Sequence, residues 1–476
     1  MEINEQVIKS IIEKVVKSVT NNLTLSLNNI NGVNLGLGIY SDIDNAIIAA
    51  EKAYLELSAI KLEKRKNIIN NIRKVILDNL EVLSKMAVEE TTMGRWEDKL
   101  IKNQLAATKT PGVEDLESVA YTDDNGLTLV EKAPYGVIGA ITPSTNPTET
   151  IINNSISMIA AGNSVVFNPH PSAKKTSVFI ISLINKAISD AGGPANLLTT
   201  ISNPTIESAQ YMMKHPKIKL LVVTGGPAVV KVALNSGKKV IAAGPGNPPC
   251  VVDETADIPK AAKDIVSGAG FDNNIICTCE KEILAVDKIT DELKKEMKNN
   301  GAWELDASQI EKLTKMVIAD PGRQGHEGAP NKKYVGKNAN VIAKDIGLTI
   351  SEDTRILLCE VDRNHPLVWT EQLMPVIPIV RMANVDDAID FAVACEHGFR
   401  HTASIHSKNI EKLSKMAKIM DCSVFIKNGP NYSGLGFNGA GFTSFTIASP
   451  TGEGMTRART FTRERRCSLV GYFRIV

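Results

Sequence analysis

Residues 136–142 read Gly-Val-Ile-Gly-Ala-Ile-Thr and are followed by Pro143-Ser144-Thr145-Asn146-Pro147. The first run is apolar and rich in β-branched residues over the length of a strand, and the prolines that follow end it. Pro147 suits the first turn of a helix, where the missing N–H costs no hydrogen bond. We therefore predict a strand over residues 136–142, a turn, and a helix over residues 147–161.

The same alternation of strand and helix continues along the chain. Further strands are predicted at residues 164–168, 196–201, 219–224 and 239–242, and helices at residues 172–191, 205–215 and 227–235. Such alternation predicts a parallel, doubly wound sheet of Rossmann type, which binds ligands at the carboxyl ends of its strands.

A second alternating region runs from about residue 245 to residue 428. We predict its strands at residues 282–286, 355–361, 375–381, 401–407 and 422–427, and its helices near residues 256–266, 385–395 and 409–420. This pattern indicates a second α/β domain. The Gly-rich interval from Asp320 to Lys337 is predicted to be a loop.

The segments that flank these regions are predicted from their spacing. Residues 41–107 are predicted to form helices with one buried face that includes Ile47, Ala50, Leu55, Ile68, Ile72, Ile76 and Leu80. Asp124-Asn125-Gly126 precedes an alternating run and predicts a protruding β-hairpin. The tail after Thr451 is basic and ends in the apolar run from Leu469 to Phe473.

The N-terminus carries an amphipathic pattern. Apolar residues between Ile3 and Val19 lie at helical spacing, and the Asn- and Gly-rich residues 21–38 resemble a tether. A short helix on a flexible linker is typical of a docking element, because its apolar stripe needs a surface to cover it. The pattern is equally compatible with a first helix packed on its own domain.

The composition narrows the class of protein. The chain has 476 residues, 43% hydrophobic, 22% charged and a net charge of +1, which describes a globular protein of several domains. This charge provides no global field for nucleic acid or an anionic membrane, and no apolar run is long enough to span a bilayer. The seven cysteines are scattered without paired spacing, as expected for reduced thiols in the cytosol.

Three short segments carry groups that are candidates for catalysis or ligand binding. Cys277 lies in a polar, loop-like context before a predicted strand, where an accessible nucleophilic thiol or an inert core cysteine would both fit. Cys277 and Cys279 lack the second ligand pair that a structural zinc site requires. Asn146 either caps the following helix or donates its amide to an oxyanion. Thr224-Gly225-Gly226 joins a strand to a helix start, which favours a phosphate.

Gly434, Gly436 and Gly439 spell a dinucleotide-binding fingerprint, but the β-forming residues after them do not open a helix, so this match is rejected. The predicted Rossmann-type sheet contains no such motif.

Taken together, these segments resemble the aldehyde dehydrogenase superfamily from about Ser41 to Gly471. They are most similar to its CoA-acylating branch, the propionaldehyde and acetaldehyde dehydrogenases of bacterial microcompartments. The resemblance rests on residues 93–99 (Met-Gly-Arg-Trp-Glu-Asp-Lys), 140–150, 168–171 (Asn-Pro-His-Pro), 224–227, 273–282 around Cys277, and 371–375 (Glu-Gln-Leu-Met-Pro).

The resemblance implies roles for single residues. Cys277 aligns with the family's nucleophile, Asn146 with its oxyanion donor, and Glu371 with a carboxylate that contacts the nicotinamide ribose. Asn168 falls where hydrolytic relatives carry a lysine near the adenosine ribose. The full implied NAD site comprises Thr142, Pro143, Asn168, His170, Thr224, Gly225, Gly226, Gly244 and Glu371. No metal is expected.

One departure from the hydrolytic branch bears on the product. Hydrolytic members carry a glutamate that activates water just before a Gly-Gly turn, and here that segment reads Ala242-Ala243-Gly244-Pro245-Gly246-Asn247. Without this base, attack by water on an acyl-enzyme should be slow, whereas a thiol such as coenzyme A needs less help. Around the nucleophile, Ile276 and Cys279 replace the usual proline and small residue.

The resemblance therefore implies an enzyme that oxidises a short-chain aldehyde such as propionaldehyde to acyl-CoA, with NAD and coenzyme A, as in propanediol utilisation. The implied fold has a helical lead-in and cofactor domain (39–245) with a hairpin near 118–134, a catalytic domain (246–446) and a C-terminal oligomerisation segment (447–476). A homodimer or homotetramer is expected, in the cytoplasm of a bacterium.

Residues 1–20 would bind a microcompartment shell protein, with residues 21–38 as linker. A hydrolytic aldehyde dehydrogenase and a non-enzymatic shell-binding cargo protein are the alternatives.

Overall fold

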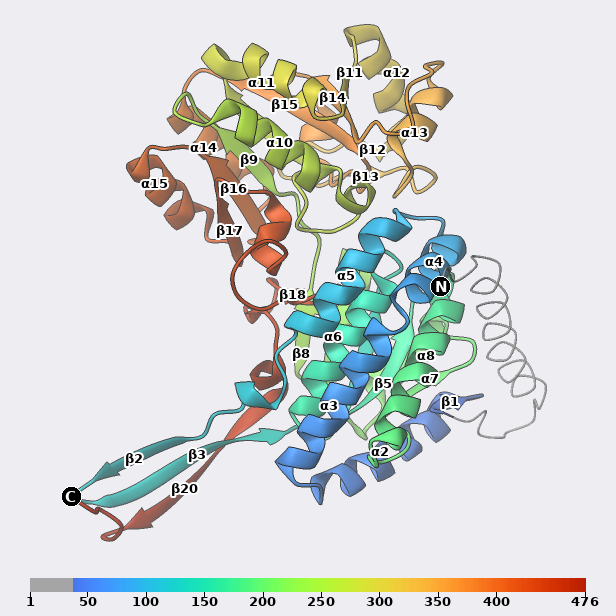
Figure 1. Ribbon diagram of the computed structural model, residues 1–476, viewed down its shortest axis with the longest axis vertical. Coiled ribbons are helices and arrows are strands. Elements are labelled where there is room, and N and C mark those ends of the chain that lie inside the picture. Colours follow the sequence, from blue (N-terminus) through green and yellow to red (C-terminus); the bar gives the residue numbers. More distant parts are fainter. Residues whose placement is uncertain (1–36) are drawn as a thin grey trace, which may run out of the picture.

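The computed structural model describes residues 37–476 and has two α/β lobes with a long β-ribbon that projects from one of them (Figure 1). The predicted helix at residues 1–20 lies outside the described residues, as do residues 21–36 of the predicted linker. The expected architecture, with two parallel α/β sheets and a separate β element, is confirmed.

The first sheet has six parallel strands in the order β1-β6-β5-β4-β7-β8. The strands are β1 (Ile39–Tyr40), β4 (Val137–Thr142), β5 (Ser164–Pro169), β6 (Leu198–Ile201), β7 (Ile218–Thr224) and β8 (Val240–Ala243). All five strands predicted here are present. β1 was not predicted, because two residues are too short for any periodic pattern.

Helices cover both faces of this sheet. Alternate strand residues, such as Ile138 and Ile141, enter different apolar clusters, because successive side chains of a strand point to opposite faces. One face packs against α3, α5, α6 and α7, and the other against α2, α8 and α9. In this part of the chain the helices are α6 (Pro147–Ala160), α7 (Lys174–Asp190), α8 (Ile206–Lys214) and α9 (Pro227–Leu234).

The helical lead-in consists of α2 (Ile43–Ser58), α3 (Leu62–Leu77), α4 (Leu80–Thr91) and α5 (Trp96–Lys109). Ile47 and Ile72 are fully buried as predicted, but Leu55 is 62% exposed, so its assignment to the buried face is wrong. At 100° per residue Leu55 lies about 80° from Ile47 on one side of the helix axis, whereas the buried Ala50, Ala53 and Leu57 lie about 60°, 120° and 80° from it on the other side.

The second sheet has seven parallel strands in the order β11-β14-β15-β10-β9-β16-β17. They are β9 (Pro249–Val252), β10 (Glu282–Val286), β11 (Ala302–Glu304), β14 (Ile356–Glu360), β15 (Val376–Met382), β16 (Thr402–His406) and β17 (Val424–Lys427). Its helices are α10 (Ile258–Ala269), α11 (Asp287–Asn299), α12 (Ala307–Val317), α13 (Ala339–Asp345), α14 (Val385–Cys395) and α15 (Ile410–Met420).

The central strand β9 was missed in the sequence, because a four-residue run that begins with proline resembles a turn. The loop predicted from Asp320 to Lys337 is interrupted by a short antiparallel pair, β12 (Ile318–Asp320) and β13 (Ala329–Pro330). The predicted domain boundary at residue 245 lies between the last strand of the first sheet and the first strand of the second. The exact domain limits stay a prediction.

The ribbon has three antiparallel strands in the order β2-β3-β20: β2 (Val119–Asp123), β3 (Gly126–Pro134) and β20 (Thr462–Val470). The predicted hairpin is confirmed. Gly126 has φ +130° at its turn, and a Cβ atom there would lie 2.0 Å from the Leu469 carbonyl oxygen, so glycine is required. The C-terminal segment therefore joins the hairpin, and the chain ends at the ribbon tip (Figure 1).

Short elements complete the structure: β18 (Ile447–Ala448), β19 (Gly454–Met455), and 3₁₀ helices at Val113–Asp115, Pro171–Ala173, Phe271–Asn274, Pro366–Val368, Asn431–Leu435 and Ala458–Phe461. Between residues 37 and 476, no helix combines the length and apolar character needed to cross a membrane.

Candidate active site

Cys277 lies in a loop between α10 and β10 that follows a strained turn. Asp272, Asn273 and Asn274 all have left-handed backbone conformations, with φ of 47°, 54° and 64°. The Asn274 amide fixes this turn by donating to the carbonyls of Ala269 and Glu280 at 2.8 and 2.9 Å. The buried Lys281 ammonium donates to the Asn274 carbonyl at 2.7 Å. These hydrogen bonds therefore fix the loop that carries Cys277 in a defined conformation.

Cys277 as a residue is partly exposed, whereas the neighbouring Ile276, Thr278 and Cys279 are buried. Burial and the nearby Glu371 carboxylate raise the pKa of the Cys277 thiol to about 12, against the opposing charges of Lys281 and Lys102. The thiol is therefore protonated in this state and has to lose its proton before it can attack a carbonyl carbon.

Asn146 precedes α6, but its side chain makes no capping hydrogen bond to that helix. Its Oδ1 accepts a hydrogen bond of 2.6 Å from the Lys102 ammonium. The only recorded partner of its Nδ2 group within the described chain is the neighbouring Thr145 hydroxyl at 3.3 Å. The capping interpretation of this residue is therefore wrong for the side chain, and the amide keeps N–H donor capacity for another acceptor.

A buried ionic cluster surrounds Asn146, and the sequence did not predict it. Lys102 Nζ lies 2.5 Å from Asp272 Oδ2 and 2.9 Å from Glu149 Oε1. Lys99 Nζ lies 3.0 Å from the same Asp272 oxygen, and all four side chains are fully buried. Lysine is rarely buried at all, so the helical pattern of α5 gave no indication of this cluster.

Gly246 brings three groups together behind the nucleophile. A Cβ atom at this position would lie 2.9 Å from the Cys277 carbonyl oxygen and 3.0 Å from the His401 ring, so only glycine fits. Its backbone also hydrogen-bonds to the Glu371 carboxylate. Burial raises the pKa of Glu371 to about 7 despite this bond and the charge of Lys281.

His401 was not predicted as part of the site. Its ring lies against Gly246, and its Nδ1 pairs with the Thr402 hydroxyl at 2.8 Å. Its buried Nε2 has no hydrogen-bond partner in the described part of the chain. Burial and the charge of Lys281 lower the pKa of this imidazole to about 4, so it is neutral at pH 7. No motif in the sequence identified this residue, because its proximity to Gly246 arises only when the strands of the second sheet are assembled.

Except for Glu371, which precedes β15 of the second sheet, the predicted cofactor residues lie at or after the carboxyl ends of strands in the first sheet. Thr142 ends β4, and its buried hydroxyl has no hydrogen-bond partner among residues 37–476. Thr224 ends β7 and pairs with the Thr446 hydroxyl at 2.9 Å. Gly226 is the N-cap of α9, and a Cβ atom there would meet no atom of the described residues within 4 Å, so among these residues the helix start is open.

A cavity of about 490 Å³ lies beside this helix start. Its walls come from α9, from Gly244 and Pro245 after β8, from Glu327, and from Phe399 and Pro450. Largely apolar walls beside an exposed helix N-terminus fit a nucleotide, which places a flat ring against hydrocarbon and a phosphate at the free N–H groups. An unpartnered buried hydroxyl at Thr142 fits the same ligand.

Two predicted cofactor residues have protein partners of their own. The Asn168 amide donates to the Thr205 carbonyl at 3.2 Å and accepts from the Ser208 hydroxyl at 2.6 Å, at the start of α8. His170 accepts a hydrogen bond of 3.1 Å from the Ser172 backbone. Both lie at the end of β5, as predicted, and Asn168 already serves α8.

The segment that carries a glutamate in hydrolytic aldehyde dehydrogenases contributes no carboxylate here. Ala242 and Ala243 are buried in β8, and the Asn247 amide donates to the carbonyls of Val368 and Cys395 at 3.0 and 2.9 Å. Asn247 therefore links the loop after β8 to the backbone of the second lobe. Within residues 37–476, no group of three or more His, Cys, Asp or Glu side chains is arranged to hold a metal ion.

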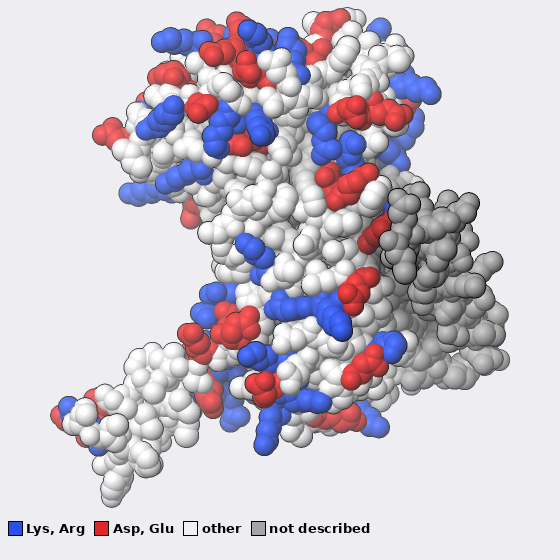
Figure 2. Space-filling view, viewed as in Figure 1, with Lys and Arg blue, Asp and Glu red and all other residues white. Residues whose placement is uncertain are grey.

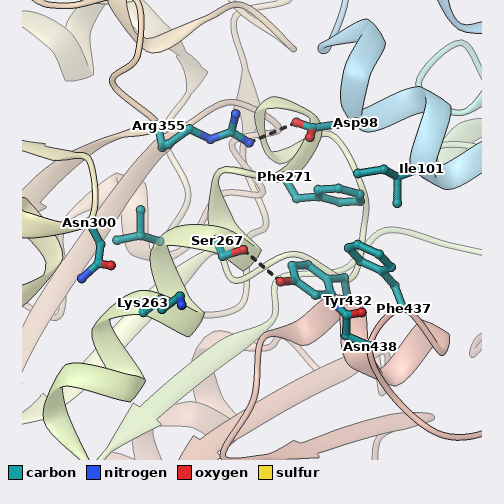
Figure 3. A pocket seen from close by; sticks show the side chains of 11 residues that line it. Asp98, Ile101, Lys263, Ser267, Phe271, Asn300, Arg355, Tyr432, Phe437 and Asn438 are labelled. Carbon is teal, nitrogen blue, oxygen red and sulfur yellow. Dashed lines mark hydrogen bonds and ion pairs between the residues drawn. The ribbon is translucent and has the colours of Figure 1, made fainter. Parts of the chain in front are cut away.

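A second cavity, of about 420 Å³, lies on the α5 side of the nucleophile loop (Figure 3). Phe271, Tyr432 and Phe437 form an aromatic wall, with ring centroids 4.9–5.7 Å apart. Opposite them Arg355 pairs with Asp98 at 3.1 Å. The lining includes Ile101, which precedes Lys102 in α5.

Comparison with known proteins places this geometry in context. The model of the aldehyde dehydrogenase family matches residues 34–445. The chain is 50% identical to the acetylating acetaldehyde dehydrogenase EutE of Salmonella typhimurium, over 98% of this chain and 99% of that protein.

Solved structures give the same result. The Rhodopseudomonas palustris propionaldehyde dehydrogenase, solved with bound CoA and an acylated cysteine, is 51% identical with a TM-score of 0.89, over 91% of this chain and 98% of that one. A propionaldehyde dehydrogenase from the fucose utilisation microcompartment of Clostridium phytofermentans is 48% identical with a TM-score of 0.89, over 92% and 100% of the two chains.

Proposed function

The chain belongs to the aldehyde dehydrogenase family, and we propose that it converts a short-chain aldehyde to acyl-CoA through a thioester on Cys277. It is a CoA-acylating aldehyde dehydrogenase that uses a nicotinamide cofactor and coenzyme A. The observation that carries the proposal is a partly exposed cysteine in a fixed loop, in a chain 51% identical to an enzyme that was solved with an acylated cysteine.

The proposed chemistry begins when the Cys277 thiol loses its proton to solvent. Its sulfur adds to the aldehyde carbon, and the carbonyl oxygen becomes an oxyanion that the Asn146 Nδ2 group stabilises by donating a hydrogen bond. When bound, the nicotinamide supplies the acceptor for the hydride released as this adduct becomes a thioester. The coenzyme A thiolate then attacks the thioester carbon, acyl-CoA leaves, and the Cys277 thiolate is restored.

The residues that would hold the nicotinamide cofactor lie at the ends of β4, β5, β7 and β8. The open start of α9 at Gly226 would receive a phosphate, and the apolar wall beside Gly244 would receive the adenine. Thr142 would use its unpartnered hydroxyl, and Glu371 would contact the nicotinamide ribose. Pro143, His170, Thr224 and Gly225 complete the proposed site, and Asn168 supports it through α8.

Transfer to a thiol is favoured over hydrolysis because residues 242–247 offer no carboxylate to activate water. A positioned general base typically accelerates such an attack by about 10²- to 10⁴-fold. Coenzyme A needs less assistance, because a thiol is the stronger nucleophile.

We propose that the aldehyde approaches through the cavity of Figure 3. Its aromatic wall includes Phe271, at the start of the nucleophile loop, and its lining includes Ile101 of α5. Apolar rings suit a short alkyl chain.

The proposed setting is a microcompartment in the cytoplasm of a bacterium, because one similar enzyme comes from a fucose utilisation microcompartment. Residues 1–20 would dock on a shell protein. Deletion of residues 1–20 should leave the turnover of the purified enzyme unchanged and should abolish its co-sedimentation with shell particles. Loss of both would favour a helix packed on its own domain.

One assay tests the proposed reaction. NADH formation is followed at 340 nm with acetaldehyde, propionaldehyde or butyraldehyde, with and without CoA, and the acyl product is identified by mass spectrometry. Turnover that requires CoA and yields acyl-CoA is expected, and Cys277→Ala should abolish it. Free acid without CoA would support the hydrolytic alternative, and no aldehyde-dependent NADH would support the cargo protein.

A further inference from the structure

Lys102 connects the proposed oxyanion donor to the nucleophile loop. Its ammonium donates to Asn146 Oδ1 at 2.6 Å and lies 2.5 Å from the Asp272 carboxylate. Asp272 stands five residues before Cys277, in the left-handed turn that fixes the nucleophile. One cation in α5 therefore contacts the proposed oxyanion donor and the turn that precedes the proposed nucleophile.

The contact with Lys102 also determines which way the Asn146 amide faces. An amide flip would turn the Nδ2 hydrogens toward an ammonium that has only donors, so the observed orientation is the one that the cation allows. With Oδ1 held, Nδ2 faces away from Lys102. Asn146 makes no capping bond to α6, so no other side-chain contact to that helix imposes this orientation.

Lys102 stays charged in spite of its complete burial. Burial lowers its pKa, but the carboxylates of Asp272 and Glu149 outweigh burial and hold the pKa above its ordinary value. A permanent charge in a dry environment polarises the amide that it contacts, and it strengthens the N–H groups as donors. A polarised amide with stronger N–H donors stabilises an oxyanion better.

We propose that Lys102 is a positioning residue for aldehyde oxidation. It holds Asn146 Oδ1 so that Nδ2 points at the developing oxyanion, and through Asp272 it keeps this amide in register with the Cys277 sulfur. This inference rests on the proposed function, in which Cys277 is the nucleophile and Asn146 the oxyanion donor.

Lys99 provides a matched control one helical turn away. It is equally buried and also contacts Asp272, at 3.0 Å, but its other partner is the Thr145 backbone carbonyl and not the Asn146 amide. Loss of Lys99 therefore removes a buried cation from the same cluster and leaves the hydrogen bond to Asn146 Oδ1 in place.

The test compares two reactions of the same sulfur. Oxidation of propionaldehyde passes through an oxyanion, whereas alkylation by iodoacetamide does not. For Lys102→Met we expect kcat/KM for the aldehyde to fall about 100-fold, as for loss of an oxyanion donor. Alkylation of Cys277, followed at pH 8 by peptide mass spectrometry, should change less than about threefold. Lys99→Met loses a contact to Asp272 but keeps the hydrogen bond to Asn146, so its kcat/KM should fall at least about tenfold less than that of Lys102→Met.

A double-mutant cycle completes the experiment. If Lys102 acts through Asn146, Lys102→Met should cost little further activity in an Asn146→Ala background, and Lys102→Arg should restore part of the loss in the single variant. Multiplicative losses, unchanged turnover in Lys102→Met, or an equal loss of alkylation would overturn the inference. If Lys102→Met does not fold, Lys102→Gln takes its place in the same cycle.

Failure of the underlying function would look different. Full activity of Cys277→Ala or of Asn146→Ala would reject the proposed mechanism itself, whatever the Lys102 variants do.

Discussion

At the scale of single residues, the charge near the nucleophile explains why the resting thiol is weakly acidic. Besides burial, the carboxylate of Glu371 raises the pKa of Cys277, and the lysines that oppose it are Lys281 and Lys102. Glu371 itself has a pKa raised to about 7 by burial. The state of Glu371 should therefore control the reactivity of Cys277 in the protein without cofactor.

The first prediction concerns this coupling. Above pH 7 the ionised Glu371 disfavours the Cys277 thiolate, so Glu371→Gln should lower the pKa of the thiol and speed its alkylation by about threefold or more at pH 9. At pH 5.5 Glu371 is protonated, so the two proteins should react at equal rates. The measurement is the rate of iodoacetamide labelling of Cys277 against pH.

Glu311→Gln, on the exposed face of α12, is the matched control and should follow the wild type at every pH. Equal rates for Glu371→Gln and the wild type at pH 9 would show that burial alone sets the acidity of the thiol.

At the scale of elements, each helix of the lead-in contributes one apolar stripe to the first lobe. In α2 the stripe contains Ala46, Ile47, Ala50, Ala53 and Leu57, all of them buried. Leu55 projects from the same helix to solvent, with 62% of its surface exposed. Two large aliphatic residues in one helix therefore differ in what they contribute to stability.

The second prediction compares these two residues. Ile47→Ala should lower the free energy of unfolding by about 2–4 kcal/mol, because it removes buried methyl groups and leaves a cavity. Leu55→Ala should change it by less than about 0.5 kcal/mol. Thermal unfolding of both variants provides the measurement. A similar fall in Tm for the two would mean that Leu55 is covered in the assembled protein.

At the scale of the whole molecule, the ribbon projects into solvent, and in a single copy of the chain its apolar side chains are exposed. β20 is an edge strand of nine residues, and exposed apolar side chains such as Val119, Tyr121, Leu469 and Val470 gather on the ribbon. Charged side chains of both signs are spread over the two lobes (Figure 2). On β20 the exposed charges of residues 463–466 lie in the half of the strand that pairs with residues 130–133, whereas residues 467–470 toward the ribbon tip are uncharged. Long, exposed edge strands with apolar residues pair readily with another chain.

The third prediction follows from this surface. We propose that the ribbon joins copies of the chain into a dimer or a dimer of dimers, so Leu469→Lys combined with Val470→Lys should reduce the mass measured by light scattering to that of a monomer. Ile410→Lys is the control, because Ile410 is 69% exposed but lies in α15, away from the ribbon. An unchanged mass in the double variant would place the interface elsewhere.

The sequence by itself determined the class of fold and most of its elements. The five strands predicted for the first sheet and the five predicted for the second are all present. Each of them is marked by a run of apolar and β-branched residues, which can be recognised from consecutive positions alone. The Asn125-Gly126 hairpin and the turn after β4 were equally local, since their turn chemistry lies within a few residues.

The tertiary structure decided what depends on distant residues. The short central strand β9 exists because β10 and β16 flank it, and Leu55 is exposed because the core meets another side of α2. The buried cluster of Lys102, Asp272 and Glu149 unites three separate segments, and the contact of His401 with Gly246 depends on the packing of the second lobe. Periodicity predicts burial from the usual preference of each residue type, and it therefore places lysine at the surface. A lysine can be buried with its charge only where folding brings carboxylates within hydrogen-bond distance, and such contacts between distant segments are not visible in the sequence.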